Sequence, residues 1–508
     1  MLSVREVPGV QRMGSACSLE LVCADCGPVT KEGVWTSPKS GVRFTGYDIN
    51  RRLVAAAVSS GIGYAQVCRF FAMLSLPTPM HRDTWWSHKN NINICASRAS
   101  DKHLQEAAEI VRKTYLETAL GNVAANGSIQ ISVSLDGTWM KRGHRSHMGL
   151  VSVIELFTGL ILDYHVLCNF CQPCLSAPDD DDPAYPEWHR KHAPVCPINH
   201  PGSSNSMEVA GAKVLFARSE DLHKFQYVKM LGDGDAKTHA AVVAMDPYDG
   251  VGIEKVECVN HVSKRMGTAL RNLVSEHKGT DSTLGGRGKL TNDRIDELTG
   301  YYGRAIKDNV GNLEGMQRAV WASFFHTIST DEDPHHSHCP DGPNSWCKYK
   351  RAEYHDVPPP PRKNPLPRGV GLFLPPVYKR LGSVELLKKC LLGKTQNANE
   401  CFHSTLWHIL PKVSWAGRKS VETAAAIAVP QFNKGSNHMF DVLMEMELSV
   451  SQSAQVFVEK TDVERVKKST RRVSTKETKR REKIATIQRR ERRERAQREG
   501  VQYAAGAF

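Results

Sequence analysis

The chain lacks the long apolar run that a membrane-spanning helix requires. No apolar stretch among its 508 residues approaches the roughly 20 residues needed to cross a bilayer. Its first segment, MLSVREVPGVQRMGS, also lacks the continuous apolar core of roughly 7–15 residues found in secretory signals. We therefore expect a soluble protein of a reducing compartment, with no membrane partner. In that setting the 14 cysteines are free thiols and metal ligands rather than disulfides.

Most of the chain also has little net charge. The formal net charge is +13, but residues 460–499 contain 17 Lys and Arg against 7 Asp and Glu, a local +10 that leaves about +3 elsewhere. This segment has no Pro or Gly and predicts a basic helix or a disordered tail. Its cations would attract DNA phosphates or form a nuclear-localisation signal, although a solvated helix explains the interspersed glutamates equally well. We expect a nuclear protein whose candidate DNA contacts here are Lys479, Arg480, Arg481, Arg489, Arg490, Arg492 and Arg493.

The order of apolar patterns predicts a mixed α/β core. After a helical region from about Ile49 to Ala119, alternation with period 2 indicates strands in IQISVSLD, HMGLVSVIEL and GLILDYHVL. A helix from about Met207, the strand FQYVKMLGD, a helix, the short strand EKVECV and a further helix follow. This βββ-α-β-α-β-α order is that of the RNase H-like fold, in which the first and fourth strands lie side by side. We therefore predict an RNase H-like mixed sheet.

Two stretches interrupt this order and set the expected division of the chain. One is a Cys- and Pro-rich insertion, and the other combines helical, His/Cys-bearing and Pro-rich pieces. The expected parts are a Cys-bearing segment (1–45), a helical domain (46–125), the first part of the core (126–277) with a zinc insertion (168–206), a mostly helical second insertion (278–390), a closing catalytic helix region (391–450) and the basic tail (451–508).

Three carboxylates are candidates for a metal-dependent active site. Asp136, in SLDGTW, and Asp233, in KMLGDGD, each end an apolar strand, so the two side chains would converge if the strands are neighbours. Glu400 follows TQNAN near the start of a later helix. Three such acids can hold two Mg²⁺ or Mn²⁺ ions for phosphoryl transfer. The alternatives are ordinary Asp-Gly turns and a helix-dipole partner, and Asp235 is a rival for Asp233.

Cations follow the first of these acids within a few residues. They are Lys141, Arg142, His144 and Arg145, and they could hold a DNA backbone near the carboxylates. A plain hairpin turn explains them as well.

The first insertion contains enough Cys and His residues for a zinc site. Cys168, Cys171 and Cys174 have C-x-x-C-x-x-C spacing, and His189, His192, Cys196 and His200 follow. Tetrahedral zinc needs four ligands. We select Cys171, Cys174, His192 and Cys196, because C-x-x-C closes one half and H-x-x-x-C the other, which leaves Cys168 spare. The alternative is buried thiols with scattered surface histidines.

Two further clusters are incomplete in the sequence. HHSHCPDGPNSWC offers His335, His336, His338, Cys339 and Cys347, and Cys258 and His261 could supply ligands from the core. A second zinc site of Cys258, His261, His338 or His336, Cys339 and Cys347 is therefore a hypothesis. Near the N-terminus, Cys23 and Cys26 form half of a zinc ribbon, with Cys17 as a possible third ligand.

Long ordered motifs give the chain a family resemblance. From about Ile49 to Phe432 it resembles the Mutator-like transposase domain, through INRRLV, SLDGTW, NHPGSSNSME, GDGDAKTH, CVNHVSKRMGTALR, LGGRGKLT, YYGRAIKDNVG, HCPDGPNSWCKY and KTQNANE. One departure is Cys401-Phe402 where a Ser-Leu-like pair is expected.

The resemblance implies an RNase H-like catalytic domain whose acids fall on Asp136, Asp233 and Glu400. It also matches Cys258 and His261 to the C-x-x-H element of Mutator-type enzymes. The implied activity is DNA strand cleavage and strand transfer by a DDE transposase, acting as a homo-oligomer on double-stranded transposon ends. The alternatives are another RNase H-like nuclease and a domesticated DNA-binding protein without catalysis.

Overall fold

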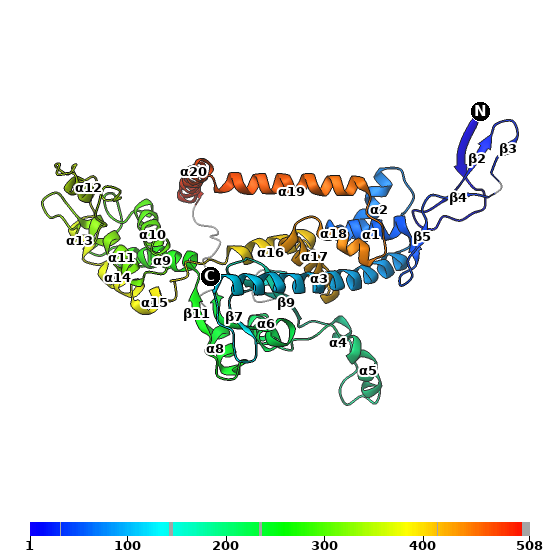
Figure 1. Cartoon of the computed structure of the whole chain (residues 1–508), viewed down its shortest axis with the longest axis horizontal. Coiled ribbons are helices and arrows are strands. Elements are labelled where there is room, and N and C mark those ends of the chain that lie inside the picture. The colour runs from blue at the N-terminus through cyan, green and yellow to red at the C-terminus, as the bar shows by residue number, and fades with distance from the viewer. Residues whose placement is uncertain (31, 142–145, 233–235, 414, 500–508) are drawn as a thin grey trace. The chain divides into compact units, whose positions relative to one another are not determined.

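The computed structural model of the chain describes residues 1–30, 32–141, 146–232, 236–413 and 415–499 (Figure 1). These residues form two compact units. The first combines Met1–Ala57, Gly63–Ala99 and the chain from Lys434 onward, and the second combines Val58–Ile62 with Ser100–Asn433.

The first unit contains short N-terminal strands and a set of helices. The strands are β1 (Leu2–Glu6), β2 (Ser18–Cys23), β3 (Gly27–Pro28) and β4 (Val34–Trp35) in one sheet, and β5 (Lys39–Ser40) paired with β6 (Gly46–Tyr47). Its helices are α1 (Asp48–Ser59), α2 (Tyr64–Met73), the first part of α3 (Arg82–Thr118), α18 (His438–Glu445), α19 (Gln452–Val473) and α20 (Thr475–Glu499). Of the two forms expected for the basic tail, the structure has the helical one.

Among the described helices, none is both long and apolar enough to cross a membrane alone. Only α1 and α2 taken together meet that criterion, and the pair is bent by 113° at the break between them.

A five-stranded mixed sheet forms the centre of the second unit. Its strands are β7 (Ile129–Trp139), β8 (Met148–Glu155), β9 (Ile161–Cys168), β10 (Phe225–Gly232) and β11 (Glu254–Glu257). The order across the sheet is β11-β10-β7-β8-β9. β7, β8 and β9 are consecutive antiparallel neighbours, whereas β10 runs parallel to β7 and β11 parallel to β10. The expected mixed sheet is confirmed, and its first and fourth strands are neighbours.

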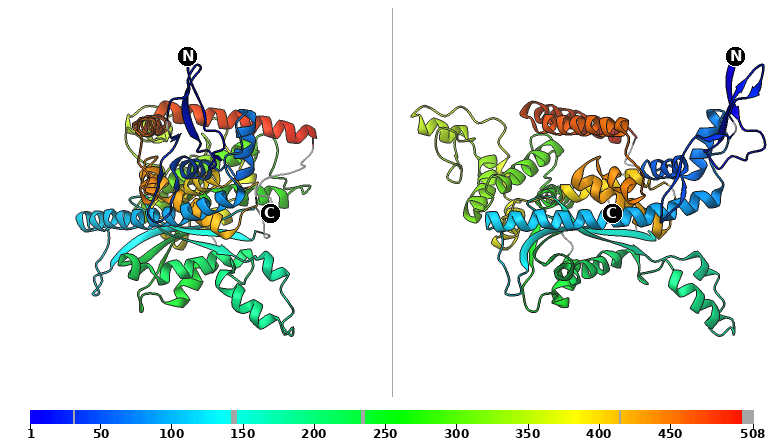
Figure 2. Two further views of the ribbon diagram at one scale, coloured as in Figure 1. Left: turned by 90° about the vertical axis from the view of Figure 1, so that its right-hand side faces the viewer. Right: turned by 45° about the vertical axis from the view of Figure 1, so that its right-hand side comes forward.

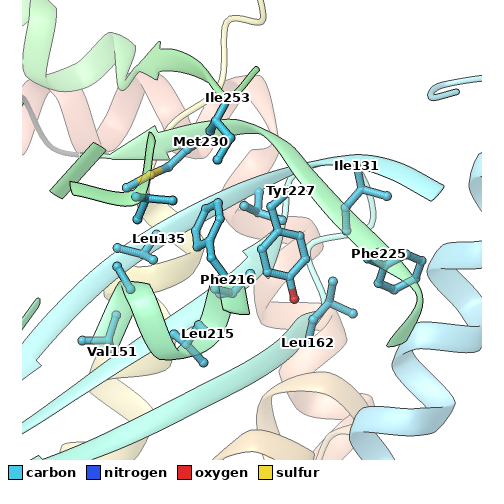
Figure 3. Packing of buried hydrophobic residues seen from close by; sticks show 14 of the residues in the cluster. Ile131, Leu135, Val151, Leu162, Leu215, Phe216, Phe225, Tyr227, Met230 and Ile253 are labelled. Atoms are coloured by element: carbon cyan, nitrogen blue, oxygen red, sulfur yellow. The ribbon is translucent and has the colours of Figure 1, made fainter. Parts of the chain in front are cut away.

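The two faces of β7 carry different side chains, because successive residues of a strand point to opposite sides. Ile131, Val133 and Leu135 are buried on one face in a core shared with α6 (Met207–Ala217) and α8 (Ala236–Met245) (Figure 3). Ser134 and Asp136 lie on the opposite face, where α16 (Asn397–Ile409) packs. Figures 1 and 2 show α6 and α8 on one side of the sheet and α16 on the other.

Several short helices lie between β9 and β10 in the chain. They are α4 (Gln172–Leu175), α5 (Tyr185–His192), the 3-10 turns Ala193–Val195 and Ser204–Ser206, and, after α6, α7 (Ser219–His223). After β11 the chain is helical, with α9 (Val259–Glu276), α10 (Asn292–Lys307), α11 (Leu313–Ile328), α12 (Lys348–Tyr354), α13 (Arg368–Gly371), α14 (Pro375–Leu381) and α15 (Val384–Lys388). Helices α9, α10, α11, α13, α14 and α15 share a hydrophobic cluster of their own. α16 and α17 (Arg418–Lys434) then close the unit.

Candidate active site and metal-ligand clusters

Asp136 lies inside β7 and does not end it. The strand continues to Trp139, and Asp136 is paired with Ser152 of β8. The sequence predicted a strand end here because Asp-Gly commonly forms a turn. Gly137 instead serves close packing, since a Cβ atom at this position would lie 2.9 Å from the Trp139 ring. The expectation that Asp136 ends its strand is therefore wrong, and the carboxylate projects from a central strand with 25% of its side chain exposed.

Helix α16 is hydrogen-bonded to β7 on both sides of Asp136. Ser134 Oγ donates to Asn399 Oδ1 at 2.6 Å, and Gln396 Nε2 donates to the carbonyl of Leu135 at 3.2 Å. Beyond Asp136, Trp407 Nε1 donates to Thr138 Oγ1 at 2.9 Å. These contacts fix the first turn of α16, which carries the exposed Glu400, along the strand of Asp136.

His403 is a site residue that the sequence reasoning missed. Its Nδ1 lies 3.8 Å from Asp136 Oδ2, and 12% of its side chain is exposed. Burial lowers the pKa of His403 to about 4, with a smaller contribution from Lys412, so the ring is neutral at pH 7. Residues three apart on a helix share a face, so Glu400 and His403 project from the same side of α16. That spacing was a signal in the sequence that could have identified His403.

The second predicted acid falls outside the described residues. This applies to Asp233 and to its rival Asp235. The preceding strand β10 is described to Gly232, and Leu231 pairs with Ser134, two residues before Asp136. The end of β10 therefore lies beside the part of β7 that carries Asp136.

Only one of the cations that follow Asp136 is described. Lys141 is exposed just after β7, and Arg142, His144 and Arg145 lie outside the described residues. In α20, Lys479, Arg480 and Arg481 are exposed. The backbone of Arg489, Arg490, Arg492 and Arg493 is helical, and their side chains are not described.

The structure brings the predicted quartet of the first insertion together. Ligand atoms of Cys171, Cys174, His192 and Cys196 all lie within 4.8 Å of one another. His192 Nε2 is 3.3 Å from Cys171 Sγ and 3.1 Å from Cys174 Sγ, and the Sγ atoms of Cys174 and Cys196 are 3.6 Å apart. Three sulfurs and an imidazole at this spacing could bind zinc.

The neighbouring candidates of the first insertion are not part of this quartet. Cys168 Sγ contacts the carbonyl of Phe170 at 3.1 Å, and His200 Nε2 lies 2.9 Å from Ser206 Oγ. The ring of His189 stacks on Tyr185.

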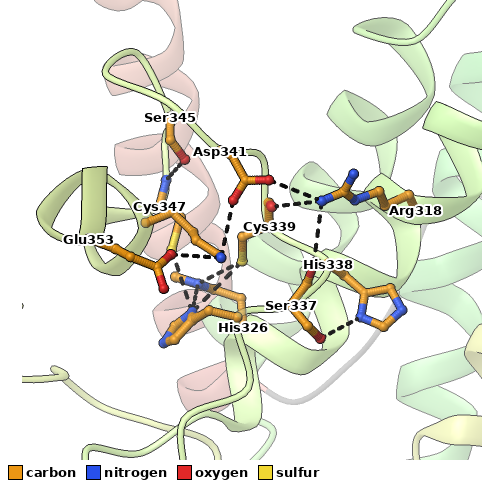
Figure 4. Close-up of polar contacts among 11 residues, drawn as sticks. Arg318, His326, Ser337, His338, Cys339, Asp341, Ser345, Cys347 and Glu353 are labelled. Carbon is orange, nitrogen blue, oxygen red and sulfur yellow. Dashed lines mark hydrogen bonds and ion pairs between the residues drawn. The ribbon is translucent and has the colours of Figure 1, made fainter. Parts of the chain in front are cut away.

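A second group of ligands forms with a different membership from the set expected. It consists of His326, His336, Cys339 and Cys347 (Figure 4). His338 is turned away, with its ring stacked on Phe325. Cys339 and Cys347 thus lie together as expected. Of the two histidines considered for this set, His336 belongs to the group and His338 does not.

The two core residues of the expected second set lie elsewhere. Cys258 is the N-cap of α9 and packs with Leu231 and Val256, and His261 lies in the first turn of that helix. Neither belongs to the group of four. The fourth member is His326 in the last turn of α11, far enough from the HHSHC motif that spacing did not indicate it.

The two thiols of the second group differ in acidity. A hydrogen bond from Cys339 lowers the pKa of Cys347, and the same contact raises the pKa of Cys339. A lowered pKa favours the thiolate, which is the form of cysteine that binds metal.

The cysteines near the N-terminus do not assemble such a group. Within residues 1–30 and the other described ranges, Cys17, Cys23 and Cys26 are not part of any cluster of three or more potential ligands. The half zinc ribbon remains a sequence-based hypothesis.

A family model described as Mutator-like transposase matches residues 2–347, more than half of the chain. Asp136 and both ligand groups lie within the match, whereas Glu400 and His403 lie beyond its end. No curated protein and no solved structure matches the chain. The chain belongs to the Mutator-like transposase family.

Proposed function

We propose that this protein is a DNA transposase that cleaves DNA strands and joins their 3′ ends through metal-dependent chemistry on an RNase H-like core. Family membership supports a transposase-type, nucleic-acid-processing function and implies DNA binding. The sheet order β11-β10-β7-β8-β9 supports the RNase H-like assignment, because it has three antiparallel strands followed by two parallel ones on the side of the first. In this proposal the protein acts as a homo-oligomer on double-stranded terminal repeats.

One observation carries the catalytic part of the proposal. α16 is hydrogen-bonded to β7 through residues on both sides of Asp136, although the partners Ser134 and Asn399 are 265 residues apart in the chain. The exposed Glu400 lies in the first turn of this helix, the turn that the hydrogen bonds of Gln396 and Asn399 hold against β7. We assign Asp136, Asp233 and Glu400 as the three acids.

The residues present fit a divalent cation. Asp136 and Glu400 offer the hard oxygen ligands that Mg²⁺ and Mn²⁺ prefer, and both remain accessible to solvent. When bound, two such ions would activate the attacking water or 3′-hydroxyl and stabilise the leaving oxygen. Asn399 and Gln396 hold the helix of Glu400 in place, and the neutral His403 packs beside the Asp136 carboxylate.

The decisive test uses the full chain, Mg²⁺ or Mn²⁺, and DNA carrying the terminal inverted repeats that flank its coding sequence. Strand cleavage followed by joining to target DNA supports a transposase. Cleavage without joining indicates another RNase H-like nuclease, and repeat-specific binding without cleavage indicates a domesticated DNA-binding protein. Absence of both binding and cleavage contradicts the proposal.

We further propose that Cys171, Cys174, His192 and Cys196 bind a structural zinc ion. The segment between β9 and α6 has few buried apolar side chains, so a metal supplies cohesion that a small core cannot. Cys171→Ser/Cys174→Ser is expected to lose one equivalent of zinc in metal analysis of the purified protein. Cys168→Ser is the matched control and is expected to keep it, because its sulfur contacts a carbonyl outside the quartet. Equal zinc content in the two variants would contradict this site.

The exposed cations of α20 are proposed as DNA contacts and as a nuclear-localisation signal. Lys479→Gln/Arg480→Gln/Arg481→Gln is expected to weaken DNA binding and to reduce the slope of log K against log salt by about 2.7, if each cation neutralises one phosphate. Binding titrations at several salt concentrations measure this slope. Replacing the exposed Lys379, Arg380 and Lys388 removes the same charge from α14 and α15 and is expected to change the slope little. Equal slopes for both triple variants would exclude α20 as the contact.

A further inference from the structure

We propose that His326, His336, Cys339 and Cys347 form a second zinc site, separate from the proposed DNA chemistry and from the quartet of the first insertion. The group joins three elements of the helical region. His326 lies in the last turn of α11, His336 and Cys339 lie in the loop that follows, and Cys347 is the N-cap of α12.

The distances between the ligand atoms agree with the edges of one tetrahedron. Zn–S and Zn–N bonds of about 2.3 and 2.05 Å place tetrahedral ligands about 3.4 Å apart for N and N, and about 3.6 Å for S and N. The Nδ1 atoms of His326 and His336 are 3.2 Å apart. Cys339 Sγ lies 3.6 Å from His326 Nδ1 and 3.8 Å from His336 Nδ1, and Cys347 Sγ lies 3.5 Å from His336 Nδ1. Both histidines therefore present the same ring nitrogen to one centre.

The ligand side chains are held in this orientation by their surroundings. His336 Nε2 lies 2.9 Å from the hydroxyl of the fully buried Ser329, which can accept a hydrogen bond from Nε2–H and so leave Nδ1 free to bind metal. The His336 ring also stacks on Tyr349 with centroids 4.3 Å apart. The backbone carbonyl of His326, in α11, accepts a hydrogen bond from Arg362 at 2.7 Å. A second partner on the other ring nitrogen, as Ser329 provides for His336, is a usual feature of metal-binding histidines.

The loop between α11 and α12 has little else to fold around. Residues 329–346, STDEDPHHSHCPDGPNSW, contain Trp346 as their only large apolar side chain, and 55% of it is exposed. Cys339 and Cys347 are nonetheless completely buried. A segment that buries its cysteines and almost nothing apolar is one that a metal ion can hold together. Two sulfur and two nitrogen ligands in tetrahedral order select zinc over magnesium or calcium.

The test is the zinc content of the purified full-length chain. Cys339→Ser/Cys347→Ser is expected to contain one equivalent of zinc less than the unchanged protein, whatever the content of the first insertion. The control is His338→Ala, which removes a histidine from the same loop whose ring stacks on Phe325 outside the group, and it is expected to keep the full content. An unchanged content in the double cysteine variant overturns the site. DNA cleavage plays no part in this readout, so it is distinguishable from failure of the proposed transposase activity.

A ligand exchange covers the case in which the double variant does not fold. His326→Cys keeps four ligands and is expected to retain the zinc, whereas His326→Asn is expected to lose it. After Co²⁺ substitution, the visible bands of tetrahedral cobalt are expected to shift in His326→Cys, because a sulfur replaces a nitrogen. Equal metal content and identical cobalt spectra in both variants overturn the assignment of His326.

Discussion

Asp136→Asn is expected to reduce the rate of metal-dependent DNA strand cleavage by roughly 10³-fold or more. Asparagine has nearly the same shape as aspartate but no negative charge. The substitution therefore leaves the strand intact and weakens the binding of a divalent cation. A catalytic metal contributes several kcal/mol to stabilising the transition state, and each 1.36 kcal/mol is tenfold in rate. The measurement is the single-turnover cleavage rate of terminal-repeat DNA in Mg²⁺. Glu400→Gln is expected to produce a loss of the same order.

The matched control for both variants is Glu254→Gln. Glu254 is a carboxylate of the same sheet, at the start of β11, with its charge 3.5 Å from Lys229 and 56% of its side chain exposed. Strand β10 separates β11 from β7, so the cleavage rate of Glu254→Gln is expected to stay within about twofold of that of the unchanged protein. Full activity in Asp136→Asn, with an unaltered circular dichroism spectrum, would falsify the assignment of Asp136 as a metal ligand.

Arg218→Met is expected to lower the free energy of unfolding of the second unit by about 3–5 kcal/mol. Arg218 Nε and Nη2 donate to the two carboxylate oxygens of Asp163 at 2.7 and 2.6 Å, and Nη2 also donates to the carbonyl of Tyr164. Only 5% of the Asp163 side chain is exposed. Methionine fills similar space but leaves a buried, unpaired carboxylate, which is the costly outcome of breaking an ion pair in a protein interior. Denaturant unfolding followed by circular dichroism measures the change.

Two companion variants separate this effect from simple loss of charge. Arg271→Met breaks an equally short ion pair with Asp296, at 2.6 Å, but 24% of the Asp296 side chain is exposed against 5% of Asp163, so the expected loss is about 0–1 kcal/mol. Asp163→Asn/Arg218→Met removes the orphaned charge and is expected to recover a large part of the stability lost in Arg218→Met. If Arg218→Met and Arg271→Met unfold at the same denaturant concentration, the ion pair of Arg218 with the buried Asp163 carboxylate contributes no more to stability than the exposed pair does.

The strands of the sheet could be predicted because their residues alternate in a way that depends only on the chain itself. Ile131, Val133 and Leu135 alternate with Ser132 and Ser134, and one set packs on α6 while the other faces α16. The end of β7 could not be predicted in the same way. Asp-Gly is a local turn signal, and what keeps Gly137 in the strand is its pairing with Val151 of β8, a contact that exists only in the folded chain.

The same distinction applies to the ligand groups. Cys171, Cys174, His192 and Cys196 lie within one short segment, so their spacing alone selected them. The second group needs His326, which belongs to a helix whose packing decides where its last turn points. His403 has a spacing from Glu400 that the sequence shows, but its closeness to Asp136 depends on the docking of α16 on β7.

The 265-residue separation between Ser134 and Asn399 has a consequence for how the protein is made. At about 5–20 residues per second, synthesis from β7 to α16 takes on the order of 10–50 seconds. The remaining sheet strands and both Cys/His groups are made within that interval, before the helix with Glu400. A nascent or prematurely terminated chain therefore holds Asp136 without its partner helix. For a protein proposed to cut DNA, the ability to do so arises only after the helix of Glu400 has been made.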